Sequence, residues 1–416
     1  MYYISTAGEG LNSPPLQGET VADAVVIGGG LTGISAAYHL ARAGADVVVL
    51  EAETVGAGAS GRNGGQLIPG LRLDWEQAAR DWGLARTQAL YRLGLDARDL
   101  VWALAEDCDL TPGHLYACVR DLHFALARAE AAFIRETLGF DHLDVVERAA
   151  LARHVTGGGY VGGLYDRLGG HFHPLKFLRG LARKALAAGA RLHEGSRVVA
   201  LEQGRNGVTV RTATGSVRAA AGIVACDALI GGLSPHLARA IMPVASYCIA
   251  TEPLPAEQAA ALLPGRAAVA DSRFALDYYR LSADNRLLFS GGETYTHTPR
   301  RDVAAFVRPH MLRVFPALAD ARIDFAWSGL VGITPNRLPQ IGRLGGALYF
   351  AHGYSGQGCL LAPFYGKAIA DHLRGDSDVY ECLSALPAFS WPGGDLLRGP
   401  LYTLGMLYYA LRDRLG

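Results

Sequence analysis

The sequence of 416 residues lacks a charge excess of either sign, a long apolar run and any recognisable cysteine pattern. Lys+Arg and Asp+Glu both number 39, so there is no electrostatic case for binding nucleic acid or an anionic membrane. No apolar run reaches the ~18 residues that a membrane-spanning helix needs. The six cysteines form neither a CxxC pair nor a zinc-type spacing, so we expect neither a metal site nor a disulfide framework.

The beginning of the sequence shows no targeting feature, because the first ten residues, MYYISTAGEG, have no basic start and no apolar core of a signal peptide. The six cysteines are expected to be buried small hydrophobic residues, so a reducing cytoplasm fits best. Residues 1–20 are polar and contain Pro14 and Pro15, which predicts an arm laid over the surface. The tail ends in an amphipathic pattern, GPLYTLGMLYYALRDRLG, and these two segments are where self-association is expected.

Residues 23–51 carry the strongest pattern that is present. A β-branched strand (Val25–Ile27) leads into GxGxxG, an amphipathic helix (Ile34–Ala43), a second buried strand (Asp46–Leu50) and an acid, Glu51. This order is typical of a dinucleotide-binding βαβ unit, in which the acid accepts hydrogen bonds from a ribose. The alternative is a structural glycine turn in another α/β fold.

The three glycines of this unit have separate expected roles. Gly28 permits the tight turn, Gly30 lets a pyrophosphate approach the backbone, and Gly33 lets the helix and strand pack closely. The positive end of the helix then faces the phosphates. The next segment, TVGAGASGRNGGQL (residues 54–67), also lets backbone N–H groups approach a ligand. Its alternative is a flexible surface loop, although loops at this position are ordinarily short.

The remaining chain predicts three further regions. Residues 75–152 have helical periodicity and look like a helical insertion, whereas residues 240–326 alternate like antiparallel strands and then form a helix at Ala304–Phe315. Residues 160–189 predict a short hairpin, a turn and a helix, with His173 as a turn or cap residue more than a catalytic base. Residues 345–373 predict a buried strand, a glycine-rich turn (GYSGQG) and a helix.

Together, the GGGLTG turn with Glu51, GASGRNGGQ, GGHFHPLK, TPNRLPQIGRL and GYSGQG resemble the FAD-dependent D-amino-acid oxidase superfamily, most of all its γ-glutamylputrescine oxidoreductase branch. The resemblance implies an α/β fold (α+β overall). A discontinuous, Rossmann-like FAD-binding domain of glutathione-reductase type would comprise residues 1–75, 153–238 and 325–416. A substrate-binding domain with an antiparallel sheet would comprise residues 76–152 and 239–324.

The resemblance also implies which residues bind FAD. The first turn would hold the pyrophosphate, the 60–66 loop the pyrophosphate and the isoalloxazine edge, Val198 the adenine, and the 353–358 turn the pyrimidine side of the ring. The implied residues are Gly28, Gly30, Leu31, Thr32, Gly33, Glu51, Ala52, Ser60, Gly61, Arg62, Asn63, Gly64, Gly65, Gln66, Val198, Gly353, Tyr354, Ser355, Gly356, Gln357 and Gly358.

Departures from the family patterns narrow the expected chemistry. Members that oxidise free α-amino acids carry a carboxylate-binding Arg in W-x-G-L-R-P, where this chain has Val331. Asn63, and Leu330 or Gly329, occupy the places of the His and Cys that tether FAD covalently in some relatives, so non-covalent FAD is implied. Gln357 stands where the amine-oxidase branch more usually has His, and Cys359 and Leu360 also replace commoner residues.

The implied reaction is hydride transfer from a small primary or secondary amine to flavin N5, followed by imine hydrolysis and reoxidation by O2. Similarity to the substrate tyrosine of the superfamily favours Tyr279 and then Tyr278 as the residue facing the flavin, the alternative being that both pack the sheet. Glu293 would suit a cationic amine terminus, and Gln357 would lie beside the ring. Arg280 would either hold an anionic tail or be solvated.

Three alternatives remain open from the sequence. The first is a demethylating oxidase of N-methylated amino compounds, and the second is a flavin dehydrogenase subunit that passes electrons to a partner. The third is a non-catalytic NAD-binding sensor, which would leave GASGRNGGQ and GYSGQG without a function.

Overall fold

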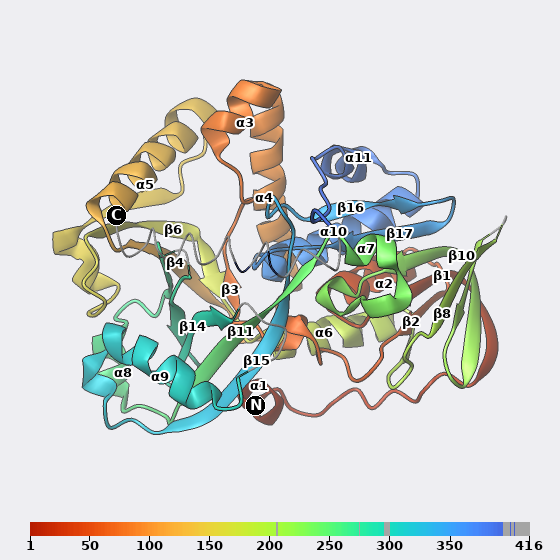
Figure 1. Cartoon of the computed structure of the whole chain (residues 1–416), viewed down its shortest axis with the longest axis horizontal. Helices are drawn as coiled ribbons and strands as arrows, with labels where there is room; N and C mark the ends of the chain where they lie inside the picture. Colours follow the sequence, from red (N-terminus) through yellow and green to blue (C-terminus); the bar gives the residue numbers. More distant parts are fainter. Residues whose placement is uncertain (205–206, 274, 295–299, 394–399, 401–402, 404–416) are drawn as a thin grey trace.

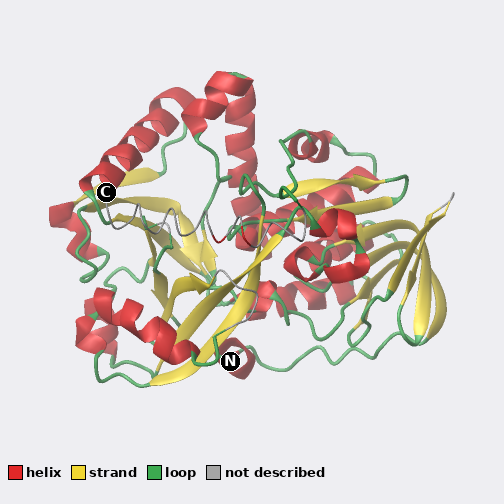
Figure 2. Cartoon of the chain, viewed as in Figure 1, coloured by secondary structure: helices red, strands yellow, loops and turns green. Residues whose placement is uncertain are grey.

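The structure is a computed structural model that describes residues 1–204, 207–273, 275–294, 300–393, 400 and 403. Its helices and strands are arranged around two sheets that lie side by side (Figures 1 and 2). The helices are α1 (Tyr2–Thr6), α2 (Leu31–Arg42), α3 (Trp75–Trp82), α4 (Leu84–Leu104), α5 (Asp121–Phe133), α6 (Pro174–Ala187), α7 (Pro235–Ala238), α8 (Ala256–Leu262), α9 (Val303–Val314), α10 (Gly358–Leu373) and α11 (Asp378–Ser384).

The first sheet has the order β16-β17-β10-β1-β2-β7, with β9 and then β8 added beside β10. Its five strands from β17 to β7 run parallel. The β2 sequence VVVL is entirely buried, as a parallel sheet covered on both faces requires. The strands are β1 (Gly18–Ile27), β2 (Val47–Leu50), β7 (Arg191–His193), β8 (Ala200–Gly204), β9 (Gly207–Arg211), β10 (Gly215–Val224), β16 (Gln340–Leu344) and β17 (Leu348–His352).

The second sheet has the order β15-β11-β14-β13-β12-β4-β6-β3, with β5 beside β6. Its pairs are antiparallel, as predicted for residues 240–326, except that β12 and β4 run parallel. Helix α9 packs against β11, β14 and β15. The strands are β3 (Gln66–Leu67), β4 (Thr111–Cys118), β5 (Leu143–Glu147), β6 (Gly162–His171), β11 (Met242–Thr251), β12 (Ala268–Asp271), β13 (Tyr278–Leu281), β14 (Leu287–Thr294) and β15 (Ile323–Ile333).

The predicted helical insertion is correct for α3, α4 and α5 but misses β4 and β5. The predicted hairpin at residues 160–173 is wrong, because β6 is one continuous strand. Its glycines allow close strand approach rather than a turn, since a Cβ on Gly169 would lie 2.6 Å from Cβ of His114. Strands β6 and β15 belong to the second sheet, although the resemblance places most of their residues in the FAD-binding domain. The division into two domains stays a proposal.

The N-terminal segment is not a surface arm over its first residues. Helix α1 packs on α6, its Tyr2 and Tyr3 rings contact Phe325 and Trp327 of β15, and Tyr3 is 0% exposed. An amphipathic helix is expected at the C-terminal residues 399–416. Apart from Pro400 and Thr403, these residues lie outside the described part of the chain.

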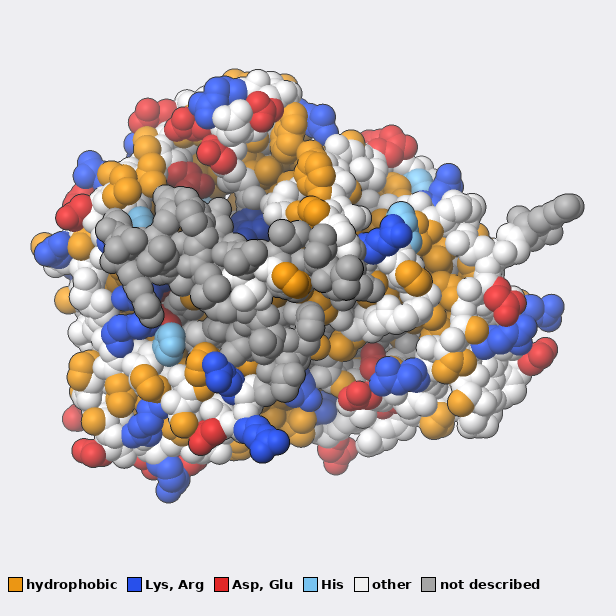
Figure 3. All heavy atoms as spheres, viewed as in Figure 1, with side chains coloured by type: hydrophobic (Ala, Val, Ile, Leu, Met, Phe, Trp, Pro, Cys, Tyr) orange, Lys and Arg blue, Asp and Glu red, His pale blue; other side chains and the backbone are white. Residues whose placement is uncertain are grey.

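Three further properties concern the surface charge, the cysteines and the apolar character of the helices. Acidic and basic side chains are interspersed on the face that Figure 3 shows, without a region of one sign. All six cysteines are free thiols. Among the described helices, none combines the length and the apolar character needed to cross a bilayer.

Candidate active site

The glycine turn between β1 and α2 forms a tight cradle. Gly28 has φ +111°, and Cβ on Gly28 would lie 2.6 Å from the Ala225 carbonyl oxygen. Cβ on Gly33 would lie 2.0 Å from the Gly28 oxygen, so both positions admit only glycine. Helix α2 begins at Leu31, three residues before the predicted start, which brings its N-terminus directly to the turn.

Glu51 lies at the carboxyl end of β2 and faces this turn. Its carboxylate accepts hydrogen bonds from the N–H groups of Gly29 (2.7 Å) and Glu53 (2.9 Å). Burial raises the pKa of the Glu51 carboxyl, while these two N–H donors lower it. A carboxylate has about four acceptor sites, so capacity for a ribose hydroxyl remains.

The 59–66 loop is fixed against the same turn by hydrogen bonds, which argues against the flexible surface loop. Ser60 Oγ accepts the Leu31 N–H (3.0 Å) at the start of α2. Asn63 Nδ2 donates to the Ala59 and Ser60 oxygens, and its Oδ1 accepts the Gly65 N–H (2.8 Å). Arg62 Nε donates to the Ala57 oxygen (2.6 Å).

The GYSGQG turn joins β17 to α10, and this segment contacts both α2 and the 59–66 loop. Gly353 has φ +76°, and its N–H donates to Asp227 Oδ1 (2.6 Å), while the Tyr354 hydroxyl lies 2.7 Å from Thr32 Oγ1 on α2. Cys359 Sγ donates to Asn63 Oδ1 (3.2 Å). The structure thus brings together three of the segments that the sequence singled out.

This arrangement fits a dinucleotide that carries a hydrogen-bonding ring. The glycine cradle leaves room for phosphates at a helix N-terminus. Gln357 Oε1, beside the start of α10, is buried without a hydrogen-bond partner among the described residues, so it can accept from a bound ligand. Val198 lies in the extended connection before β8 rather than in the predicted strand, and packs on the first sheet's apolar cluster.

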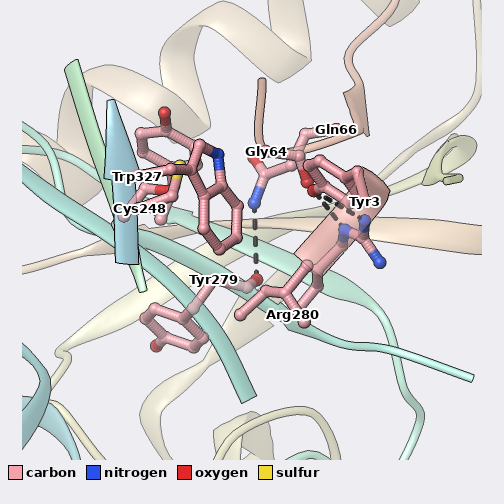
Figure 4. Close-up of a pocket in the computed structure, with 10 residues that line it drawn as sticks. Tyr3, Gly64, Gln66, Cys248, Tyr279, Arg280 and Trp327 are labelled. Atoms are coloured by element: carbon pink, nitrogen blue, oxygen red, sulfur yellow. Dashed lines mark hydrogen bonds between the residues drawn. The ribbon is translucent and has the colours of Figure 1, made fainter. Parts of the chain in front are cut away.

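A narrow crevice lies between the 64–66 backbone and the second sheet (Figure 4). The Tyr278 ring lies against Gly64, where a Cβ would be 2.5 Å from Tyr278 Cε2. The Tyr278 hydroxyl lies 3.3 Å from Ser246 Oγ on β11. The crevice is lined by Tyr3, Gly64, Gln66, Cys248, Tyr278, Tyr279, Arg280, Leu288, Ser290 and Trp327.

The surroundings of the two tyrosines favour Tyr278 over Tyr279 as the residue that would face the flavin, and the assignment stays a prediction. Because side chains alternate along a strand, Tyr278 and Tyr279 point to opposite faces of β13. The Tyr279 ring stacks on Phe289 (5.3 Å between centroids), its hydroxyl lies 2.9 Å from that of Tyr160, and only 1% of it is exposed. Figure 4 shows the Tyr279 ring directed away from Trp327. The Tyr279 ring therefore packs in the core, whereas the Tyr278 ring lies against Gly64 in the crevice.

Gln66 and Arg280 both donate to backbone oxygens, and Glu293 is described only through its backbone. Gln66 Nε2 donates to the Val269 oxygen (2.9 Å), so its side chain joins β3 to β12 within the second sheet. Arg280 is neither solvated nor at the surface, because only 3% of it is exposed and Nε donates to the Gly64 oxygen (2.7 Å). Glu293 pairs through its backbone with Ser246, and its side chain lies outside the described part.

His173 is a cap residue, as predicted. Its Nδ1 accepts the Lys176 N–H (3.1 Å) at the start of α6, and Nε2 lies 2.9 Å from Thr6 Oγ1. Burial lowers its pKa to about 3, with the nearby Arg280 charge as the second cause, so the ring is neutral at pH 7. A ring with both nitrogens occupied is poorly placed to act as a base.

Sequence reasoning missed Tyr3 and Asp227 as residues of this region. Asp227 has φ +43° and holds the Gly353 N–H, but neither motif nor periodicity marks it. Tyr3 was hidden in a polar, proline-containing segment. The short run Met1–Ile4 was the apolar signal that could have indicated its burial.

Comparisons with known proteins agree with this geometry. A model of the FAD dependent oxidoreductase family (DAO) matches residues 23–372. The chain is 39% identical over 420 residues to γ-glutamylputrescine oxidoreductase of Escherichia coli (strain K12), covering 100% of this chain and 98% of that protein.

Solved structures share the fold. Glycine oxidase from Geobacillus kaustophilus has a TM-score of 0.73 at 22% identity, covering 86% of this chain and 95% of its own. L-Proline dehydrogenase from P. horikoshii has a TM-score of 0.71 at 21% identity, covering 87% and 96%. The chain therefore belongs to the DAO family, and it is an FAD-dependent oxidoreductase.

Proposed function

We propose that this enzyme oxidises a small primary or secondary amine of the γ-glutamylputrescine type. The observation that carries the proposal is the 39% identity to γ-glutamylputrescine oxidoreductase over nearly the full length of both chains. FAD, when bound, supplies the acceptor for a hydride from the carbon that bears nitrogen. The residues proposed to hold it are those of the glycine turn, Glu51, the 60–66 loop, Val198 and the 353–358 turn, without a covalent bond.

The absence of an arginine at position 331 supports an amine rather than a free α-amino acid. Val331 lies on β15 and pairs with Val244 of β11, so this strand position offers no guanidinium to an α-carboxylate. The Tyr278 hydroxyl and Ser246 are proposed to contact the substrate. Glu293 pairs with Ser246 across the strands and is proposed to bind a cationic amine terminus.

The proposed overall reaction is R–CH2–NH2 + O2 + H2O → R–CHO + NH3 + H2O2. The amine carbon loses a hydride and nitrogen loses a proton, water adds to the imine, and oxygen takes up both electrons. The buried crevice is proposed to exclude water from the carbon during hydride transfer. A cytoplasmic site for this reaction is proposed from the six free thiols.

The test is turnover in air with γ-glutamylputrescine, putrescine, sarcosine and D-alanine, with aldehyde, ammonia and H2O2 measured together. Equal amounts of all three products from γ-glutamylputrescine are expected, and pyruvate from D-alanine is not. If sarcosine is the one substrate of the four that reacts, with formaldehyde as its product, the demethylating alternative is favoured. Aldehyde that forms only with an artificial electron acceptor would overturn O2 as the acceptor.

A further inference from the structure

Arg280 is a buried cation without a paired anion. Only 3% of the residue is exposed, and no Asp or Glu side chain that the structure describes forms an ion pair with it. Its three hydrogen bonds go to neutral groups: the Gly64 oxygen (2.7 Å), the Tyr3 hydroxyl (3.1 Å) and the Leu281 oxygen (3.5 Å). Burying an unpaired charge is costly, so its retention calls for an anion that arrives with a ligand.

The position of Arg280 identifies which ligand group this is. Nε binds the Gly64 oxygen, and a Cβ on Gly65 would lie 2.9 Å from Nη2, so the guanidinium lies against the 64–65 backbone. The guanidinium therefore lies against the 60–66 loop, which is proposed to flank the flavin ring.

Tyr3 fixes this guanidinium from the far side. Tyr3 is 0% exposed, and its hydroxyl accepts from Arg280 Nη2. Its ring packs edge-on against Trp327 (5.4 Å between centroids), whose Nε1 donates to the Arg62 oxygen (2.9 Å). Tyr3 therefore contacts both side chains that bind the carbonyls of the 62–64 loop, and Figure 4 shows it beside Arg280.

We propose that the N-terminal helix is part of the cofactor site, with Tyr3 as a positioning residue that holds the Arg280 guanidinium against the 62–65 loop, where its positive charge stabilises the negative charge of the reduced flavin. A fixed cation in a buried site acts more strongly than one in water. The inference depends on the FAD site and not on the identity of the amine.

The test compares reduction potentials of the FAD-loaded enzyme, measured by dye equilibration without any amine. Arg280→Met is expected to make the potential more negative, and Tyr3→Phe to shift it in the same direction by less. Arg280→Lys keeps the charge and is expected to restore much of the potential. The matched control is Tyr2→Phe, which removes a hydroxyl bonded to Asp284 (2.7 Å) and not to Arg280, and it should leave the potential unchanged.

A second measurement distinguishes a positioning role of Tyr3 from a contribution to folding stability alone. Loss of one hydrogen bond to a charged group is expected to raise the FAD dissociation constant of Tyr3→Phe by up to roughly tenfold. If Tyr3→Phe lowers only the melting temperature, with unchanged potential and FAD affinity, the proposal is wrong. If Arg280→Met does not bind FAD at all, Tyr3→Phe and Arg280→Lys still decide the question. These readouts stay valid if the proposed amine proves incorrect.

Discussion

At the scale of single residues, the two adjacent tyrosines of β13 have different surroundings and different expected roles. Tyr278 lines the crevice, whereas Tyr279 stacks on Phe289 in the core beneath the sheet. The sequence predicts that they face opposite sides, because strand periodicity is two. It cannot tell which of the two rings packs in the core, since that depends on how β13 pairs with strands far away in the chain.

Paired hydroxyl deletions test this division. Tyr278→Phe is expected to lower kcat/KM by about tenfold, the typical effect of losing one hydrogen bond in a site, at unchanged melting temperature. Tyr279→Phe breaks the bond to Tyr160 and is expected to cost about 1 kcal/mol of unfolding free energy at unchanged kinetics. Steady-state kinetics and urea unfolding of both variants check this, and the reverse pattern would restore Tyr279 as the substrate tyrosine.

Glu293 is the second residue whose role is testable by a conservative change. Glu293→Gln removes the charge but keeps the shape, so KM for a doubly cationic amine such as putrescine should rise by roughly tenfold, with less change in kcat. The matched control is benzylamine, which carries one amino group, and its KM should rise less. An equal rise for both amines would argue against a cation-binding role.

At the scale of elements, the cofactor turn depends on a close crossing of α2 and α10. Gly366 lies at this crossing, and Cβ there would be 2.2 Å from the Thr32 oxygen. Gly366→Ala is therefore expected to force the helices apart and destabilise the fold by about 1–3 kcal/mol, with weaker FAD binding. Gly180→Ala in α6 is the control, because Cβ there meets nothing within 4 Å, and it should be neutral or slightly stabilising.

Thermal melting and FAD titration of both glycine variants provide the measurement. Equal melting temperatures for Gly366→Ala and the unsubstituted enzyme would contradict the close crossing. The elements themselves were predictable to different degrees. The β1–α2–β2 unit follows from local periodicity and turn chemistry, whereas β6 was missed because its paired glycines resemble turns until β4 lies beside them.

At the scale of the whole molecule, buried neutral histidines make stability depend on pH. Burial, as the largest cause, lowers the pKa of His114 to about 4 and the pKa values of His171, His173 and His352 to about 3. The unfolded chain binds these protons near pH 6.5, so the stability falls as pH decreases from about 6.5 toward the folded values. Urea unfolding between pH 7.5 and 5 should show this fall.

His352→Gln isolates one of these groups. His352 lies 3.2 Å from Gln340 Oε1, and its removal should reduce the slope of unfolding free energy against pH by up to about 1.4 kcal/mol per pH unit between pH 4 and 6. An unchanged slope would mean that His352 is protonated in the folded enzyme.

The whole molecule also sets the limit of prediction from sequence. The motifs identified the cofactor and three loops that lie together in the structure, because each motif carries its own turn and helix start. The Tyr3–Arg280 contact joins residues 277 positions apart, and no local pattern reports such a contact. The strand order of the second sheet is hidden for the same reason, since β4 and β6 come from segments with helical or turn-like composition.

Anaerobic reduction of the purified yellow enzyme by γ-glutamylputrescine tests the central claim most directly. The absorbance band of the bound flavin is expected to bleach within the mixing time of a manual experiment and to return when air is admitted. Putrescine should bleach it more slowly, and D-alanine should leave it unchanged because Val331 offers no carboxylate clamp. Bleaching by D-alanine with no response to either amine would contradict the account.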